Sequence, residues 1–202
     1  MLIEAKEKII LLILVLFLPS LGLIACSNST NTIKAEDHHS QQDIDNSFKK
    51  AEVLFDNDKP EEAYNILKKL AEQGDAKSQN SLGNGYQHGF WGEIDLKQAK
   101  YWYQKAADQN YAGGIHNLGM LEFLQGNYKK ALTYFEKSAH LNNANSVNIL
   151  GIYYSEGIIF PQDYKKALEY FNKALHIDAS NASAKLNVGQ AYYYGEVVTQ
   201  LY

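Results

Sequence analysis

The chain has a single cysteine, Cys26, and no arginine, so all 19 of its basic residues are lysines. A lone cysteine has no partner within the chain, which excludes an intramolecular disulfide. Proteins that read base edges or bind phosphates through two parallel hydrogen bonds normally use arginine. Because arginine is absent and the net charge is −4, we do not expect nucleic acid among the partners.

Motifs for catalysis or metal binding are also scarce. The segment 47–50 matches Ser-x-x-Lys, but the further motifs of the enzymes that use this nucleophile do not follow it. The pair His38-His39 has no further ligands at the spacing of a zinc site, and the other histidines stand alone. The sequence therefore predicts a protein that is not an enzyme and that uses neither a metal nor another cofactor.

An apolar run, residues 9–18, lies near the N-terminus and is followed by Leu23-Ile24-Ala25-Cys26. The length of this run is typical of a signal peptide, whereas a membrane-spanning helix needs about 20 apolar residues. The four residues that end at Cys26 resemble the lipobox of bacterial lipoproteins. The resemblance implies cleavage before Cys26, attachment of diacylglycerol to its thiol and acylation of the new amino terminus. An uncleaved membrane helix and a secretory signal without lipid are the alternatives.

These features divide the chain into three parts. Residues 1–25 are predicted to be the signal peptide, residues 26–46 the lipidated cysteine with a flexible polar tether, and residues 47–202 a folded domain. Ser27, which follows the cysteine, resembles the residue found in lipoproteins that are sent on to the outer membrane. The expected location is therefore the bacterial cell envelope, with the anchor at the periplasmic face of the outer membrane.

From residue 48 onward the sequence repeats itself. A Leu-Gly or Val-Gly pair recurs every 32 to 38 residues, at Leu82-Gly83, Leu118-Gly119, Leu150-Gly151 and Val188-Gly189. After each of the first three pairs comes an alanine that is followed, at helical spacing, by two adjacent aromatic residues, as in Ala99 and Trp102-Tyr103. A period of this length is typical of stacked helical hairpins, in which each hairpin shelters the apolar face of its neighbour.

The unit that starts at Leu82 resembles a Sel1-like repeat. The matching residues are Leu82, Gly83, Tyr86, Gly89, Asp95, Ala99, Trp102, Lys105, Ala106 and Ala107. The 144–178 unit resembles the same family, and its end, residues 174–178, resembles the related tetratricopeptide repeat. The 112–143 unit departs, because Glu122 stands where a tyrosine is expected. The resemblance covers about residues 48–195 and implies an all-α fold, an α-solenoid of antiparallel helix pairs with about four hairpins and an incomplete last repeat.

The ends of the predicted helices carry their own signals. Asp58, Asp95, Asn127 and Asp163 have the side chains and the positions of N-caps for the second helices. The last repeat is expected to complete a first helix at Gly195 without a second helix after it. This leaves Val197, Val198, Leu201 and Tyr202 partly exposed. A packed C-terminal tail, a contact with a second copy of the chain and a truncated reading frame are the three interpretations.

The resemblance also implies where a partner binds, because the first helix of each pair lines the concave face of such a solenoid. The candidate residues are Lys77, Asn80, Asn84, Gln87, His88, His116, Met120, Phe123, Leu124, Asn145, Asn148, Ile152, Ser155, Gln190 and Tyr193. Their amides can bind the backbone of an extended peptide without reading its sequence, and Phe123 and Tyr193 offer aromatic anchors.

The sequence therefore predicts a membrane-anchored protein–protein interaction scaffold of the bacterial cell envelope. Its partners are expected to be a protein or peptide on the concave face and the membrane through Cys26, with a homo-oligomer possible through the C-terminal end. One alternative is a lipoprotein that binds peptidoglycan or exopolysaccharide, suggested by the 15 tyrosines. A hydrolase is the third hypothesis, and the sequence offers no catalytic residues for it.

Overall fold

The computed structural model describes the backbone of residues 40–200 and the side chains of residues 40–195. The signal peptide, the lipid attachment at Cys26 and the His38-His39 pair lie outside the described residues, as do the side chains of Val197, Val198, Leu201 and Tyr202. The described residues belong to a single unit of packed helices.

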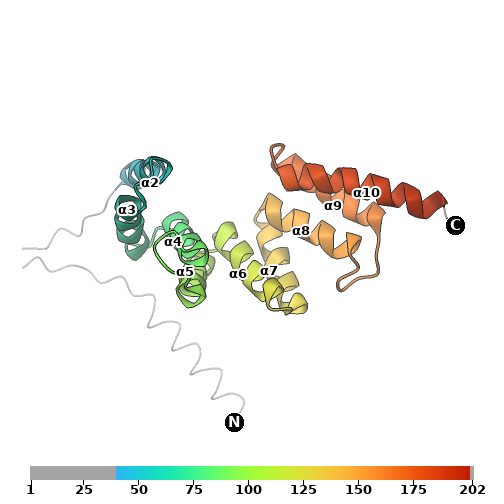
Figure 1. The fold of residues 1–202 in the computed structure, drawn as a ribbon, viewed down its shortest axis with the longest axis horizontal. Helices are drawn as coiled ribbons and strands as arrows, with labels where there is room; N and C mark the ends of the chain where they lie inside the picture. The colour runs from blue at the N-terminus through green and yellow to red at the C-terminus, as the bar shows by residue number, and fades with distance from the viewer. Residues whose placement is uncertain (1–39, 201–202) are drawn as a thin grey trace, which may run out of the picture. The chain divides into compact units, whose positions relative to one another are not determined.

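The described residues form helices joined by short connections, and no strand occurs among them. The helices are α2 Gln41–Asp56, α3 Pro60–Glu72, α4 Ala76–His88, α5 Leu96–Asp108, α6 Ala112–Leu124, α7 Tyr128–His140, α8 Ala144–Ser155, α9 Tyr164–Ile177 and α10 Ala182–Gln200. Each helix contacts the next one along the chain, and in addition α4 contacts α6 and α8 contacts α10. Helices that are neighbours in sequence are thus neighbours in space, as the ordered change of colour in Figure 1 shows. This arrangement confirms the predicted all-α solenoid of helix pairs.

The first described helix, α2, begins earlier than predicted. We expected the polar tether to extend to Asn46, but α2 starts at Gln41. Ser40 caps it, because the Ser40 Oγ accepts a hydrogen bond from the Asp43 N–H at 3.3 Å and the Asp43 carboxylate accepts one from the Ser40 N–H at 3.2 Å. The tether prediction was wrong for residues 41–46 because most of these side chains face solvent, so their polarity hides the helix.

Two of the four predicted N-caps of the second helices are confirmed. The Asp95 carboxylate accepts hydrogen bonds from two backbone N–H groups at the start of α5, and Asp163 does the same once for α9. Asn127 holds the N-cap position of α7, but its side chain donates to the Glu122 carboxylate instead. The prediction for Asp58 was wrong, because Asp58 has a φ of 56° and Lys59 is the N-cap of α3.

In the three complete repeats, the glycine of the Leu-Gly pair lies against an aromatic ring of the following helix. The facing pairs are Gly83 with Tyr103, Gly119 with Phe135, and Gly151 with Phe171. A Cβ atom added at any of these glycines would lie less than 3.0 Å from the ring, and each ring is almost completely buried. The close approach of the two helices in each pair therefore depends on the missing side chain of the glycine.

The last helix, α10, is longer than predicted. We expected the first helix of the last repeat to end at Gly195, but α10 continues to Gln200 as one helix of 19 residues. The three interpretations of this end of the chain remain predictions. None of the helices in the described part of the chain has both the length and the apolar character that crossing a bilayer requires.

The glycine–ring contacts give a stability prediction with a control inside the same molecule. We expect Gly151→Ala to lower the free energy of unfolding by about 1–3 kcal/mol, because the new methyl group must displace the Phe171 ring. Gly189 occupies the same repeat position, yet a Cβ built there meets no described atom within 4 Å. Gly189→Ala should therefore stabilise the chain by up to about 1 kcal/mol through helix propensity. Denaturant unfolding followed by circular dichroism measures both changes, and equal effects of the two substitutions would contradict the packing argument.

Candidate partner-binding surface

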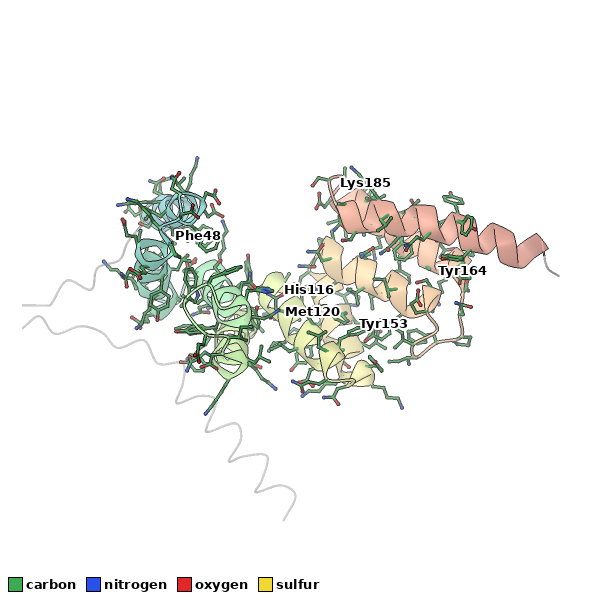
Figure 2. The ribbon with its side chains drawn as sticks, viewed as in Figure 1. Phe48, His116, Met120, Tyr153, Tyr164 and Lys185 are labelled. Carbon is green, nitrogen blue, oxygen red and sulfur yellow. The ribbon has the colours of Figure 1, made fainter. Side chains whose placement is uncertain are left out.

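The predicted partner-binding residues lie on α4, α6, α8 and α10, the first helices of their repeats. We call this set of residues the first-helix face. Figure 2 marks two of them, His116 and Met120, on α6 in the middle of the array. Direct contacts join α4 to α6 and α8 to α10, so parts of this face are continuous from one repeat to the next.

Side-chain amides connect the first helices to each other. Between α4 and α6, the Asn117 Nδ2 donates to the Asn80 Oδ1 at 2.9 Å and to the Asn84 Oδ1 at 3.0 Å. Between α8 and α10, the Asn187 Nδ2 donates to the Asn148 Oδ1 at 2.9 Å. The predicted residues therefore serve as acceptors for the neighbouring helix, and part of their hydrogen-bonding capacity is used within the fold.

The same pattern extends to two further predicted residues. The Asn145 Oδ1 accepts from the Asn181 Nδ2 at 2.8 Å, and the Gln87 Oε1 lies 2.9 Å from the hydroxyl of Tyr103. That hydroxyl also lies 2.8 Å from the Asn84 Oδ1. Burial raises the pKa of Tyr103 above its usual range, so the hydroxyl stays protonated, and its single O–H is shared between these two oxygens.

The oxygens of these side-chain amides accept hydrogen bonds within the fold, but their nitrogens remain available to a partner. Among the described residues, the side-chain NH₂ groups of Asn80, Asn84, Gln87 and Asn145 donate no hydrogen bond within the fold. Each group can give two N–H donors. The first-helix face therefore presents donors, which suit the carbonyl oxygens of a peptide backbone.

Asn148 is a correction to the predicted surface. Its side chain is only 4% exposed and is bonded to Asn187, so it joins two helices and has too little surface to contact a partner. Met120 and Phe123 are half-buried in the core of the α6–α9 region. The Phe123 ring packs 5.2 Å from Tyr128 and 5.9 Å from Tyr153, which makes it a packing residue more than an anchor.

The remaining predicted residues fall into two groups. Lys77, His88, Leu124, Gln190 and Tyr193 are exposed. Ile152, Ser155 and Gln190 come together in a small hollow of about 190 Å³ between α8, α9 and α10. The structure thus gathers three of the predicted residues in this hollow, and it brings Asn80, Asn84 and Gln87 together through their bonds to Asn117 and Tyr103.

Between α6 and α8, a histidine, His116, makes the connection that asparagine amides make between the other first helices. Its Nδ1 lies 2.8 Å from the Ser146 Oγ, and its ring packs 5.6 Å from the Phe135 ring. Burial lowers the pKa of His116 from 6.5 to about 4, so the imidazole is neutral near pH 7. The side chain joins two repeats and is poorly placed to carry charge to a partner.

The lowered pKa of His116 predicts a pH-dependent stability. The unfolded chain protonates this histidine below pH 6.5, whereas the folded chain does so only near pH 4. The free energy of unfolding should therefore decrease as the pH is lowered from 6.5 to 4. The loss amounts to at most about 3 kcal/mol, since one pKa unit corresponds to about 1.4 kcal/mol. His116→Gln removes the titration, and its unfolding free energy should decline less over this range. If the free energies of unfolding of the wild type and of His116→Gln changed with pH in parallel, the lowered pKa of His116 would be disproved.

An aromatic hollow lies beside the first-helix face and was not predicted. It has a volume of about 460 Å³ between α2, α3, α4 and the α4–α5 connection. Its lining includes Phe48, Val53, Phe55, Leu67, Ser81, Asn84, Phe90 and Trp91. Phe55 and Phe90 are 38% and 45% exposed, and their rings lie 5.1 Å apart. The hollow therefore offers accessible apolar surface next to the amide of Asn84.

Local sequence explains how this hollow forms. Gly89 ends α4 with a φ of 72°, which a glycine adopts readily, and turns the chain into the α4–α5 connection. The Trp91 ring then lies against Gly85, where any side chain would collide with the indole. Two adjacent aromatic residues in a connection, Phe90-Trp91, were the signal in the sequence that could have revealed this site.

Glu122, the departure from the expected tyrosine, is a buried carboxylate that ties three helices together. It accepts hydrogen bonds from the Lys130 Nζ at 2.7 Å, the Asn127 Nδ2 at 2.9 Å and the Lys100 Nζ at 3.4 Å. The hydrogen bond from Lys130 holds the pKa of Glu122 below its usual range. Among the residues with described side chains, no group of three His, Cys, Asp or Glu residues is placed to hold a metal ion.

Comparison with known families agrees with this architecture. The Sel1 repeat family matches residues 57–75, 76–111, 144–176 and 182–200, which is more than half of the chain. The chain therefore belongs to the Sel1 repeat family. A tetratricopeptide repeat matches residues 112–145, the unit that contains Glu122, whereas the sequence pattern placed the tetratricopeptide likeness at 174–178. Repeats of this kind generally bind protein or peptide partners and are generally not catalytic.

Each comparison with an individual relative covers only part of this chain and only part of that relative. The putative sel1-like repeat-containing protein L21 of Acanthamoeba polyphaga mimivirus is 38% identical over 79 residues, which are 39% of this chain and 15% of that protein. A protective antigen of uropathogenic Escherichia coli with an SLR fold is 31% identical, covers 65% of this chain and 29% of its own, and has a TM-score of 0.55. A Sel1 repeat protein from Oxalobacter formigenes is 24% identical, covers 75% of this chain and 64% of its own, and has a TM-score of 0.64, which supports the fold alone.

Proposed function

We propose that this chain is a lipid-anchored interaction scaffold of the bacterial cell envelope, which binds an extended segment of a partner protein along its first-helix face. The observation that carries the proposal is the set of free amide donors on the first helices, one of which, Asn84, also lines the aromatic hollow. The Sel1 repeat architecture supports it, because repeats of this kind bind proteins or peptides.

The amide donors define how the partner's backbone is bound. The inter-helix hydrogen bonds hold Asn80, Asn84 and Asn145 by their oxygens, so each NH₂ group is fixed in place before the partner arrives. Ordering these side chains in advance reduces the entropy lost on binding. Backbone carbonyls occur in every peptide, so this contact gives affinity without a strict sequence requirement.

The aromatic hollow supplies the selective part of the interaction. Asn84 belongs to both sites, so a backbone bound at Asn84 lies beside Phe55 and Phe90. A volume of about 460 Å³ is within the range of ordinary ligand pockets and accepts a large apolar side chain. The partner segment should therefore carry a bulky apolar residue where it passes Asn84.

A double substitution in the hollow tests this assignment. We expect Phe55→Ala with Phe90→Ala to reduce capture of the partner at least tenfold, because buried aromatic contacts dominate binding energy. The measurement is cross-linking in intact cells followed by affinity capture of the full-length chain. Tyr101→Ala is the matched control, since Tyr101 is a 49% exposed aromatic residue on α5, outside the hollow.

The outcomes separate protein binding from the alternative of glycan binding. Capture of the same partner at the wild-type level by the double variant would reject the hollow. Pelleting of the wild-type chain with purified peptidoglycan, with no protein captured, would favour a role in binding the cell wall. Unfolding curves of both variants verify that the fold is retained.

The membrane anchor rests on the lipobox at Cys26. A chain that carries several acyl groups stays on a membrane, because each buried methylene contributes about 0.8 kcal/mol. We expect Cys26→Ser to abolish incorporation of a labelled fatty acid and to release the protein from the membrane fraction. Serine is similar in size to cysteine but lacks the thiol, so continued labelling would exclude Cys26 as the attachment site.

A further inference from the structure

An exposed apolar face runs along α10. Leu186, Gly189 and Tyr193 follow one another at helical spacing, and Leu186 and Tyr193 are 63% and 66% exposed. The opposite side of α10 carries Ala184 and Ala191, which are buried in contacts with α8 and α9. Only one side of this helix is therefore covered by the described part of the chain.

The three complete repeats show what covers the equivalent face. Gly83, Gly119 and Gly151 each receive an aromatic ring from the next helix, and an alanine stands four residues before that ring. The pairs α4–α5, α6–α7 and α8–α9 thus each contain the same glycine–ring contact. Gly189 holds the same place in the fourth repeat, and no atom with described coordinates lies within 4 Å of a Cβ built on it.

Tyr193 also indicates that α10 lacks, among the described residues, the ring that covers the equivalent face in the earlier repeats. It lies five residues after the valine of its Val-Gly pair, and the corresponding residues of two earlier repeats are Gln87 and Phe123. Gln87 lies 2.9 Å from the Tyr103 hydroxyl, and the Phe123 ring lies 6.4 Å from the Phe135 ring. In these two repeats the position contacts the ring that covers the glycine, whereas the third repeat has Ser155 there. By analogy with the first two repeats, α10 presents two parts of the contact without the third.

We infer that α10 docks an amphipathic helix of a partner protein, in which an alanine is followed four residues later by an aromatic ring. The ring occupies the space over Gly189 and contacts Tyr193. This surface shares Tyr193 with the first-helix face but is separate from the aromatic hollow, and it selects a helical partner by its spacing of residues.

A second copy of the chain is a poorer occupant. Four helices of the described region carry an alanine that is followed four residues later by an aromatic ring, namely α2, α5, α7 and α9. Their alanines, Ala51, Ala99, Ala131 and Ala167, are almost fully buried in their own hairpins. A second copy would have to open one of these hairpins to supply the missing ring. A helix from another protein meets no such cost.

The α9 sequence itself provides a probe of known chemistry. A fluorescent, helix-stapled peptide with the sequence of Tyr164–Ile177 contains the required alanine and ring. We expect it to bind the full-length chain, held in detergent, with saturable fluorescence anisotropy. The same peptide with alanine at the Phe171 position should bind at least tenfold more weakly.

Substitutions in the protein locate the site. Gly189→Ala should weaken peptide binding at least tenfold, because its methyl group takes the place of the ring, while the fold is at least as stable as the wild type. Ser183→Ala, an exposed position on another side of α10, should bind as the wild type does. The Phe55 and Phe90 double variant should also bind normally, which separates this site from the aromatic hollow.

Three results would overturn the inference. They are absence of binding to the wild-type chain, binding that Gly189→Ala leaves unchanged, and dimerisation of the wild-type chain that Gly189→Ala abolishes. The last result would assign the face to a second copy of the chain.

Discussion

The absence of a side chain at one position in each first helix lets an aromatic ring of the second helix lie directly against the helix backbone. Tyr103, Phe135 and Phe171 occupy this place in successive hairpins, and each is almost fully buried. Dispersion forces fall steeply with distance, so a gap of even one methyl group would cost much of the contact. The spacing of the pairs α4–α5, α6–α7 and α8–α9, and with it the position of the side chains that α4, α6 and α8 contribute to the first-helix face, depends on this approach.

The second constraint on the array is polar and acts between repeats. Asparagine side chains join α4 to α6 and α8 to α10, while His116 and Ser146 join α6 to α8. Each bond satisfies a partly buried polar group, and an unsatisfied group of this kind is costly. The same bonds hold the amides whose NH₂ groups donate no hydrogen bond among the described residues. In the proposed function, the oxygen of each amide has the structural role and its nitrogen the binding role.

Periodicity was enough to predict the repeats, because the Leu-Gly pairs and the alanine–ring stripes are local patterns that a one-dimensional sequence displays. The start of α2 was missed, since Ile44 is the one apolar residue among its first six and a polar helix resembles a tether. The aromatic hollow was missed because Phe55 and Phe90 are distant in sequence and meet only after folding. The amide pairs were visible in part. Asn80 with Asn117 and Asn148 with Asn187 occupy the same two repeat positions, but only the three-dimensional register shows that they bond.

Each described helix touches its sequence neighbours and, at several places, the next helix but one. An additional hairpin in such an array creates one new interface and leaves distant ones untouched. The length of the molecule can therefore change by whole units while the existing sites keep their geometry. In evolutionary terms, duplication of a repeat extends the protein at little structural risk, whereas a change of one residue in the spacing within a hairpin would separate a glycine from its ring.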